Sequence, residues 1–326
     1  MRYGFLVPLL FVAYTGVMAA ELEPKDEAEF AKIVAKDAKV EKLGGGMKFL
    51  EGPAWVAKDG GYLLFSDIPS NQIKKWSAKE GLTTFRDPCN NTNGHFIGPD
   101  GLLYSCEHTA RRISMTEADG KVVTVVDAFE GKKLSSPNDL VLKSDGTIWF
   151  TDPPYGVPKG EKKEQETNNV YRFDPKTKTL TAVIKDCDMP NGLTFSPDEK
   201  KLYVADSGKP RSIRVFDVNA DGTVANGKIF CALDKGAPDG IRTDSEGRVW
   251  SSAGDGIQIF NTDGALIGKI HMPPPPPDPA KPLPEGKVAA GETPANLCFG
   301  GEDMKTLYIT ARTSLYSIKV LVAGKK

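Results

Sequence analysis

Alternating apolar and polar residues recur along the chain as pairs of short strands. Residues 140–150, "LVLKSDGTIWF", place two alternating runs around a "KSDG" turn, which is the pattern of an antiparallel hairpin. The order of a small residue or proline, a polar residue, an apolar strand, a turn and an aromatic strand returns six times. The six equivalent positions are Glu51, Asn93, Asn138, Asn191, Asp239 and Ala295. They lie 42 to 56 residues apart, so the chain contains an internal repeat.

Each repeat also has a second hairpin half, such as "NNVYRFDPKTKTLTAVI" at residues 168–184. Four short strands per repeat, with no helical periodicity between them, are what one blade of a β-propeller requires. The sequence therefore predicts an all-β fold, a six-bladed β-propeller with four-stranded antiparallel blades, over residues 40–326. A β-sandwich is the alternative, but nothing in a sandwich requires six repeats in phase.

The N-terminal residues have a different pattern. Residues 1–20 carry one charge, Arg2, and an apolar run that ends in small residues, which predicts a secretory signal peptide. An uncleaved membrane anchor is the alternative, but Pro8 and the marginal length favour cleavage near Ala19 or Ala20. We therefore expect a periplasmic or secreted protein with no stable membrane association after cleavage.

Residues 21–39 are expected to form an N-terminal helical segment. Phe30, Ile33 and Val34 follow helical spacing and predict a short amphipathic helix packed on the outside of the ring. The residues that follow it, "KVEKLGGGMKFLEG", are expected to add an outer strand to the last blade. Such a strand would close the ring and remove its exposed edges.

Composition narrows the choice of function. A net charge of -1 and a pI near 6.4 give no basic surface for nucleic acid. Three histidines, five cysteines and no CxxC pair argue against a structural zinc site, and we interpret the cysteines as buried thiols. The proline-rich residues 271–294 are expected to be a surface insertion, with a partner-binding motif or a lip over the channel as alternatives.

The repeat also predicts a site. The innermost strands of a propeller run along its axis, so residues in one phase of the repeat converge at one mouth of the channel. Glu51, Asn93, Asn138, Asn191 and Asp239 bring five oxygen-bearing side chains there, and buried polar groups need partners. A hard divalent cation binds carboxylate and carboxamide oxygens, so we expect a metal site, although Asn-Gly and Asp-Gly are also common turn sequences.

Several of these segments resemble a known family. "EGPAW", "SPNDLVLKSDGTIWFTDPPYG", "PNGLTFSPDEKKLYVADS" and "PDGIRTDSEGRVW" are similar to signatures of the gluconolactonase, senescence marker protein and regucalcin family. The segments "SCEHTARR" and "TDPPYG" are similar to its bacterial gluconolactonase branch. The resemblance extends from about residue 40 to the C-terminal "TLYITARTSLYSI" and implies a six-bladed propeller that hydrolyses sugar lactones with one divalent metal ion.

Carried over by position, the resemblance implies metal ligands at Glu51, Asn191 and Asp239, with the further channel asparagine at Asn138. Ca²⁺ is the expected ion, with Zn²⁺, Mn²⁺ and Mg²⁺ as alternatives. The animal members have an arginine two residues before that asparagine, where this chain has Ser136, which leaves the sugar open.

The chemistry expected of this site is hydrolysis of a metal-polarised carbonyl by an activated water. Asp239 is the expected base, and the alternatives are Asp206, Asp152 and His108 at the ends of second strands. The expected substrate-binding residues are Asn93, His108, Asn138, Asp152 and Asp206. Tyr155 and Arg111 are candidates for the rim of the site.

Two other functions remain open. Related propellers hydrolyse aryl lactones and organophosphates, although the polar residues expected here suit a sugar better. A ligand-binding propeller with a structural calcium ion and no enzymatic activity is the other alternative. Neither the lactone nor the oligomeric state follows from the sequence.

Overall fold

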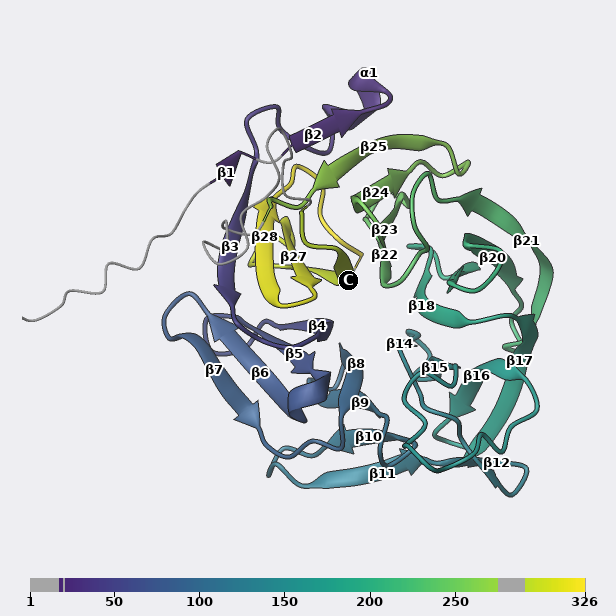
Figure 1. The fold of residues 1–326 in the computed structure, drawn as a ribbon. Coiled ribbons are helices and arrows are strands. Elements are labelled where there is room, and N and C mark those ends of the chain that lie inside the picture. Colours follow the sequence, from purple (N-terminus) through teal and green to yellow (C-terminus); the bar gives the residue numbers. More distant parts are fainter. Residues whose placement is uncertain (1–17, 20, 275–290, 326) are drawn as a thin grey trace, which may run out of the picture.

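The computed structural model describes residues 18–19, 21–274 and 291–325 (Figure 1). The predicted signal peptide, apart from Met18–Ala19, and most of the proline-rich insertion lie outside these residues. Within the described part of the chain, no helix is both long and apolar enough to span a membrane.

Six antiparallel sheets are arranged as blades around one axis, and this confirms the predicted propeller (Figure 1). Blade 1 consists of β4 (Leu50–Val56), β5 (Tyr62–Asp67), β6 (Gln72–Ser77) and β7 (Gly81–Arg86). Blade 2 consists of β8 (Thr92–Ile97), β9 (Leu103–Glu107), β10 (Arg112–Thr116) and β11 (Val122–Val126). Blade 3 consists of β14 (Leu140–Leu142), β15 (Ile148–Asp152), β16 (Asn168–Asp174) and β17 (Thr179–Cys187). Blade 4 consists of β18 (Pro190–Phe195), β19 (Lys201–Asp206), β20 (Ser212–Val218) and β21 (Val224–Ala232).

Blade 5 consists of β22 (Ile241–Thr243), β23 (Val249–Ala253), β24 (Gly256–Phe260) and β25 (Leu266–His271). Blade 6 contains β26 (Pro294–Gly300), β27 (Thr306–Ala311) and β28 (Ser314–Lys319). A small hairpin of β12 (Ala128–Phe129) and β13 (Lys132–Lys133) lies between blades 2 and 3, and a 3-10 turn, η1 (Ile68–Ser70), follows β5.

The ring is closed by the N-terminal part of the chain. The strand β3 (Lys39–Gly45) pairs with β28 and is the fourth strand of blade 6, as predicted, and β1 (Met18–Ala19) pairs with β3 in turn. The first blade therefore cannot separate from the last without breaking a ladder of backbone hydrogen bonds.

The predicted N-terminal helix is much shorter than expected. The helix α1 spans only Glu27–Phe30, whereas β2 (Glu21–Pro24) extends blade 5 by pairing with β25. The open edge of β25 offers unpaired backbone groups, and β2 satisfies them. Phe30, Ile33 and Val34 are nevertheless buried in the apolar cluster between blades 5 and 6, as their spacing predicted.

The blades are held together by apolar side chains from adjoining sheets. Trp149 of blade 3 meets Phe195 of blade 4 edge-on with ring centroids 5.3 Å apart, and Trp250 meets Phe299 in the same way at 5.4 Å. Aromatic pairs of this geometry add to the stability gained by burying their surface. All five cysteines are buried and unpaired, as expected.

Hydrogen bonds between neighbouring blades join the innermost strands near the axis. The amides of Gly192 and Gly240 donate to the carbonyl oxygens of Asp239 and Ala295 at 3.0 and 2.8 Å. Side chains make equivalent bonds, because Thr151 donates to the carbonyl of Asn191 at 2.6 Å. A Cβ atom built on Gly192 would lie 2.4 Å from the Asp239 carbonyl oxygen. These strands are thus in backbone contact, and glycine is required there.

We expect Gly192→Ala to lower the stability of the protein by at least ~2 kcal/mol, because the methyl group would force two blades apart. Gly44→Ala, in the outer strand β3, is the matched control. Its Cβ would meet only the movable end of Leu82 at 3.3 Å, and a change within ~0.5–1 kcal/mol is expected. Urea denaturation measures both variants, and equal losses would contradict the requirement for glycine at the axis.

Candidate functional site

Six of the eight predicted site residues line one cavity. The cavity has a volume of about 410 Å³, which is within the roughly 300–1,000 Å³ of small-molecule sites. Its polar lining includes Glu51, Asn93, His108, Asn138, Asn191 and Asp239. Six residues that are distant in sequence thus meet at the place that the repeat indicated.

A break in each inner strand turns these side chains into the channel. The pairing of β4 with β5 shifts register between Glu51 and Ala54, and that of β18 with β19 between Pro190 and Leu193. Blades 2 and 6 have the same shift, whereas β14 and β22 begin just after Asn138 and Asp239. A bulge changes the direction of the side chain at that point, so the repeated polar residue points into the cavity instead of a sheet face.

Glu51 and Asp239 are the two carboxylates of this cavity. Glu51 is only 4% exposed, and its Oε2 accepts hydrogen bonds from its neighbour Gly52 at 2.8 Å and from Asn296 at 3.0 Å. Burial raises the pKa of Glu51 to about 7. Burial, and then repulsion by Glu51 and Asp139, raises the pKa of Asp239 well above its usual value. The two carboxylates therefore lie close enough to oppose each other's ionisation.

Sequence analysis assigned no role to Asp139, Arg242 and Asn296, which form a connected polar group beside this pair of carboxylates. Arg242 Nη1 lies 3.1 Å from Asp139 Oδ2, and Asn296 Nδ2 lies 3.5 Å from the same oxygen. Asp139 and Asn296 stand where four other repeats have glycine. The four glycines are Gly52, Gly94, Gly192 and Gly240. This departure from the repeat is the signal by which the two residues could have been found.

His108 and Asn93 form a neutral polar pair in the wall. Asn93 Nδ2 and His108 Nε2 are 3.3 Å apart, and the backbone at Gly156 lies against the imidazole ring. Burial lowers the pKa of His108 to about 4. The ring is therefore neutral near pH 7, and its polar atoms are suited to hydrogen bonding.

Two further residues of the mouth come from loops. Tyr155, a candidate rim residue, and Ser207, which was not predicted, both line the cavity. Tyr155 is 47% exposed, so its ring borders the opening. Arg111 does not line the cavity, because its side chain is buried and its Nε donates to the carbonyl of Leu134 at 2.7 Å.

Asp152 and Asp206 are not open to the cavity as a substrate-binding role requires. The oxygens of Asp152 accept from the amides of Ser135 and Ser136 at 2.7 and 2.8 Å. Asp206 accepts in the same way from Asp188 and Met189, at 2.9 and 2.8 Å.

Each of these aspartates binds the two amides that lie three and two residues before the polar position of its repeat. Asp67 repeats the arrangement in blade 1, with the amides of Lys48 and Phe49. The strand-end carboxylate thus fixes the segment that presents the site residue, and its role is positioning.

The described residues contain no group of three or more His, Cys, Asp or Glu side chains placed to hold a metal ion. A metal here would need carboxamides as well as carboxylates. Glu51 and Asp239, with the side chains of Asn138 and Asn191, are an all-oxygen set of the kind that Ca²⁺ and similar hard cations accept. The site fits a divalent cation, and its wall offers neutral hydrogen-bonding groups to a small polar molecule.

Comparisons with known proteins identify relatives of this chain in sequence and in fold. Residues 49–283 match the model of the SMP-30/Gluconolactonase/LRE-like region. A gluconolactonase of Zymomonas mobilis is 32% identical over 311 residues, which cover 87% of this chain and 82% of that protein. The structure of a gluconolactonase from Xanthomonas campestris superposes with a TM-score of 0.82 at 32% identity, covering 95% of this chain and 99% of that one.

A calcium-binding regucalcin of Agrobacterium tumefaciens has a similar fold. Its TM-score is 0.67 at 19% identity, with coverage of 87% of this chain and 94% of that one.

We predict that His108 does not contribute an ionisation to the pH dependence of turnover, because burial keeps its pKa near 4. His108→Gln keeps a polar side chain. The pH profile of turnover between about pH 6 and 8 should therefore have the same shape in the variant as in the unaltered protein. The lost hydrogen bond should raise KM by about 10-fold or less. Steady-state rates across this range test the expectation, and disappearance of an inflection near neutral pH in the variant would show that His108 titrates during turnover.

Proposed function

This chain belongs to the SMP-30/Gluconolactonase/LRE-like family and is a lactone hydrolase, and we propose that it opens sugar lactones with the help of one divalent metal ion. The observation that carries the proposal is the convergence of Glu51, Asn138, Asn191 and Asp239 on one cavity. Two carboxylates and two carboxamides in one cavity are a donor set that suits a hard cation.

Charge supports a doubly positive ion. The carboxylates of Glu51, Asp139 and Asp239 act on one another electrostatically, and Arg242 forms an ion pair with Asp139. When all three carboxylates are ionised, they exceed the guanidinium by two negative charges. A divalent cation would offset that excess, since burying unbalanced charge is costly.

Ca²⁺ is our preferred ion because every donor is an oxygen, and the regucalcin with this fold is described as calcium-binding. Zn²⁺, Mn²⁺ and Mg²⁺ remain alternatives, because each of them also accepts carboxylate oxygens.

A divalent cation bound to these residues would polarise the lactone carbonyl and stabilise the negative charge that develops on its oxygen. Asp239 takes a proton from the attacking water, which adds to the carbonyl carbon. The ring C–O bond then breaks, and Asp239 returns the proton to the departing ring oxygen. The product is the open hydroxy acid, and Asp239 ends in the state in which it began.

The rest of the wall suits a polyhydroxylated ring. Asn93, His108 and Ser207 are hydrogen-bonding groups that carry no charge at neutral pH, and Tyr155 at the opening can cover a sugar face. An aryl lactone or organophosphate is the second candidate, because Phe49, Ile68 and Pro69 give one side of the cavity an apolar surface.

Hydrolysis of a panel of aldonolactones, aryl esters and a phosphotriester, each with and without chelator, tests the proposed function. We expect chelator-sensitive hydrolysis of aldonolactones. Preference for the aryl esters or the phosphotriester would favour the second candidate. Metal binding without hydrolysis of any substrate would indicate a ligand-binding propeller with a structural ion.

Asp239→Asn separates binding of metal from acceptance of a proton. The variant keeps an oxygen of similar position but removes the negative charge and the base. We expect turnover to fall by at least ~10²-fold even at saturating metal. Asn191→Asp is the matched variant, because it also exchanges carboxamide and carboxylate, and it should leave turnover within about 10-fold while altering metal affinity. Full recovery of Asp239→Asn with added metal would make Asp239 a ligand only.

We also propose that the protein acts in the periplasm or outside the cell after removal of residues 1–20, as the apolar N-terminal sequence indicates. Mass spectrometry of protein expressed in its own host should give an N-terminus close to Glu21. An intact Met1 in a cytoplasmic fraction would be incompatible with export.

A further inference from the structure

We propose that the Asp139–Arg242 ion pair sets the charge of the metal site, and that Asn296 positions the metal ligand Glu51. The carboxamide of Asn296 contacts the carboxylates of Glu51 and Asp139. Asp139, Arg242 and Asn296 are positioning residues, since none of them lines the cavity that would hold substrate. The inference rests on the proposed function, because it concerns the affinity of the same site for a divalent cation.

The contacts form one connected chain of polar atoms. Asn296 Nδ2 donates to Glu51 Oε2 at 3.0 Å and approaches Asp139 Oδ2 at 3.5 Å. Arg242 Nη1 donates to the same Asp139 oxygen at 3.1 Å. The Asp139 side chain is 1% exposed and that of Arg242 is 12% exposed. Since water is nearly excluded, each group depends on the next one for its hydrogen bonds and charge balance.

The pair joins blades that are not neighbours. Asp139 precedes β14 in blade 3 and Arg242 lies on β22 in blade 5, so the ion pair passes across the axis. Asn296 belongs to blade 6 and Glu51 to blade 1. A chain of contacts among four blades can hold Glu51 at a fixed distance from Asp239 in a way that no single sheet can.

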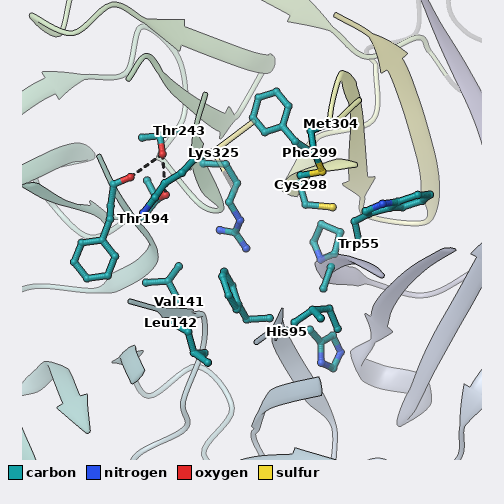
Figure 2. Close-up of a pocket in the computed structure, with 16 residues that line it drawn as sticks. Trp55, His95, Val141, Leu142, Thr194, Thr243, Cys298, Phe299, Met304 and Lys325 are labelled. Carbon is teal, nitrogen blue, oxygen red and sulfur yellow. Dashed lines mark hydrogen bonds between the residues drawn. The ribbon is translucent and has the colours of Figure 1, made fainter. Parts of the chain in front are cut away.

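Arg242 is unusual at its position in the repeat. The equivalent residues in the other blades carry no charge, and they are Ala54, Phe96, Val141, Thr194 and Cys298. Arg242 lines a second cavity of about 190 Å³. Most of the residues around this cavity lie further along the same inner strands, and they include both apolar and polar side chains (Figure 2). An arginine in such surroundings needs a carboxylate, and Asp139 supplies it.

The consequence for a bound cation follows from the number of charged side chains close to its site. With the pair intact, Glu51 and Asp239 supply the net charge of the site. Loss of the Asp139 charge leaves the guanidinium of Arg242 uncompensated close to the cation site, and loss of the Arg242 charge has the opposite effect. Loss of both charges restores the original balance, so the double variant separates an electrostatic role from simple disruption of packing.

The test titrates Ca²⁺ into metal-free full-length protein by calorimetry and records the thermal midpoint without metal. Asp139→Asn should weaken Ca²⁺ binding by at least ~10-fold, because an unpaired positive charge in a poorly solvated site repels the ion. Arg242→Met should lower the thermal midpoint without weakening Ca²⁺ binding. The double variant Asp139→Asn/Arg242→Met should bind Ca²⁺ within about 3-fold of the unaltered protein.

Two further variants sharpen the test. Asn296→Ala leaves the charge unchanged and should weaken Ca²⁺ binding by about 3- to 10-fold through the loss of one hydrogen bond to Glu51. Lys325→Met is the control, because Lys325 also lines the second cavity but pairs with Glu199 at 3.4 Å. It should leave Ca²⁺ binding unchanged.

The outcomes are distinguishable. If the unaltered protein binds no divalent ion, the proposed metal site fails, and this inference fails with it. If the unaltered protein binds Ca²⁺ and Asp139→Asn binds it within 3-fold, only the inference is overturned. If Asp139→Asn does not fold, the double variant decides, and its failure to recover Ca²⁺ binding would overturn the electrostatic role.

Discussion

The arrangement of this protein depends on how closely six strands approach one axis. The innermost strands lie so near one another that backbone amides of one blade donate to backbone carbonyls of the next, as Gly192 does to Asp239. In four of the six blades this position is glycine, and no Cβ atom fits there. The residue before each such glycine therefore has one free direction for its side chain, the open end of the channel. The crowding that requires glycine at one position thus directs the polar residue beside it into the cavity.

This crowding brings carboxylates of like charge close together in the site. Glu51, Asp139 and Asp239 are brought together by the symmetry of the fold, and burial raises the pKa of both Glu51 and Asp239. An apolar ring would be more stable in isolation, because desolvated carboxylates disfavour ionisation. The protein retains the charges, balances one of them with Arg242, and leaves the other two facing the cavity. This excess of negative charge is the electrostatic support for the proposed cation.

The repeat made much of this predictable from sequence. Oxygen-bearing side chains in one phase of five of the six repeats identified the ring of Glu51, Asn93, Asn138, Asn191 and Asp239. The closure by residues 39–45 followed from the need to cover an edge. Side chains that break the repeat were not predicted in their roles. Asp139 and Asn296 resemble turn residues in sequence, and only the fold places them beside Glu51.

The N-terminal strand β2 was missed for a related reason. Helical spacing of apolar residues reports which side chains are buried, and Phe30, Ile33 and Val34 are buried as expected. It does not report whether a neighbouring sheet has an open edge. The pairing of β2 with β25 is decided by that edge, which lies more than 200 residues away in the sequence. Periodicity therefore identified the buried face correctly and overestimated the helix.

The aspartates at the strand ends connect the ring of polar residues to the loops at the mouth of the cavity. Asp152 and Asp206 hold the backbone that precedes Asn138 and Asn191, and the next residues along the chain lead to Tyr155 and Ser207 at the mouth. One carboxylate thus fixes a residue of the polar ring on one side, and on the other side it begins a loop that lines the mouth of the cavity. The loops can differ in sequence while this anchor keeps the ring in place.

Ser136 illustrates this division between the ring and the loops. Its Oγ donates to the Pro153 carbonyl at 2.6 Å and accepts from the Gly156 amide at 2.8 Å, so it shapes the Tyr155 loop. Glu51 and Asp239 belong to blades 1 and 5, and the hydrogen bonds of the Ser136 hydroxyl do not reach them. Under the proposed function, the loop that Ser136 shapes would contact the lactone, and the ring of Glu51 and Asp239 would perform the chemistry. The contacts that shape the loop are therefore separate from those that hold the ring.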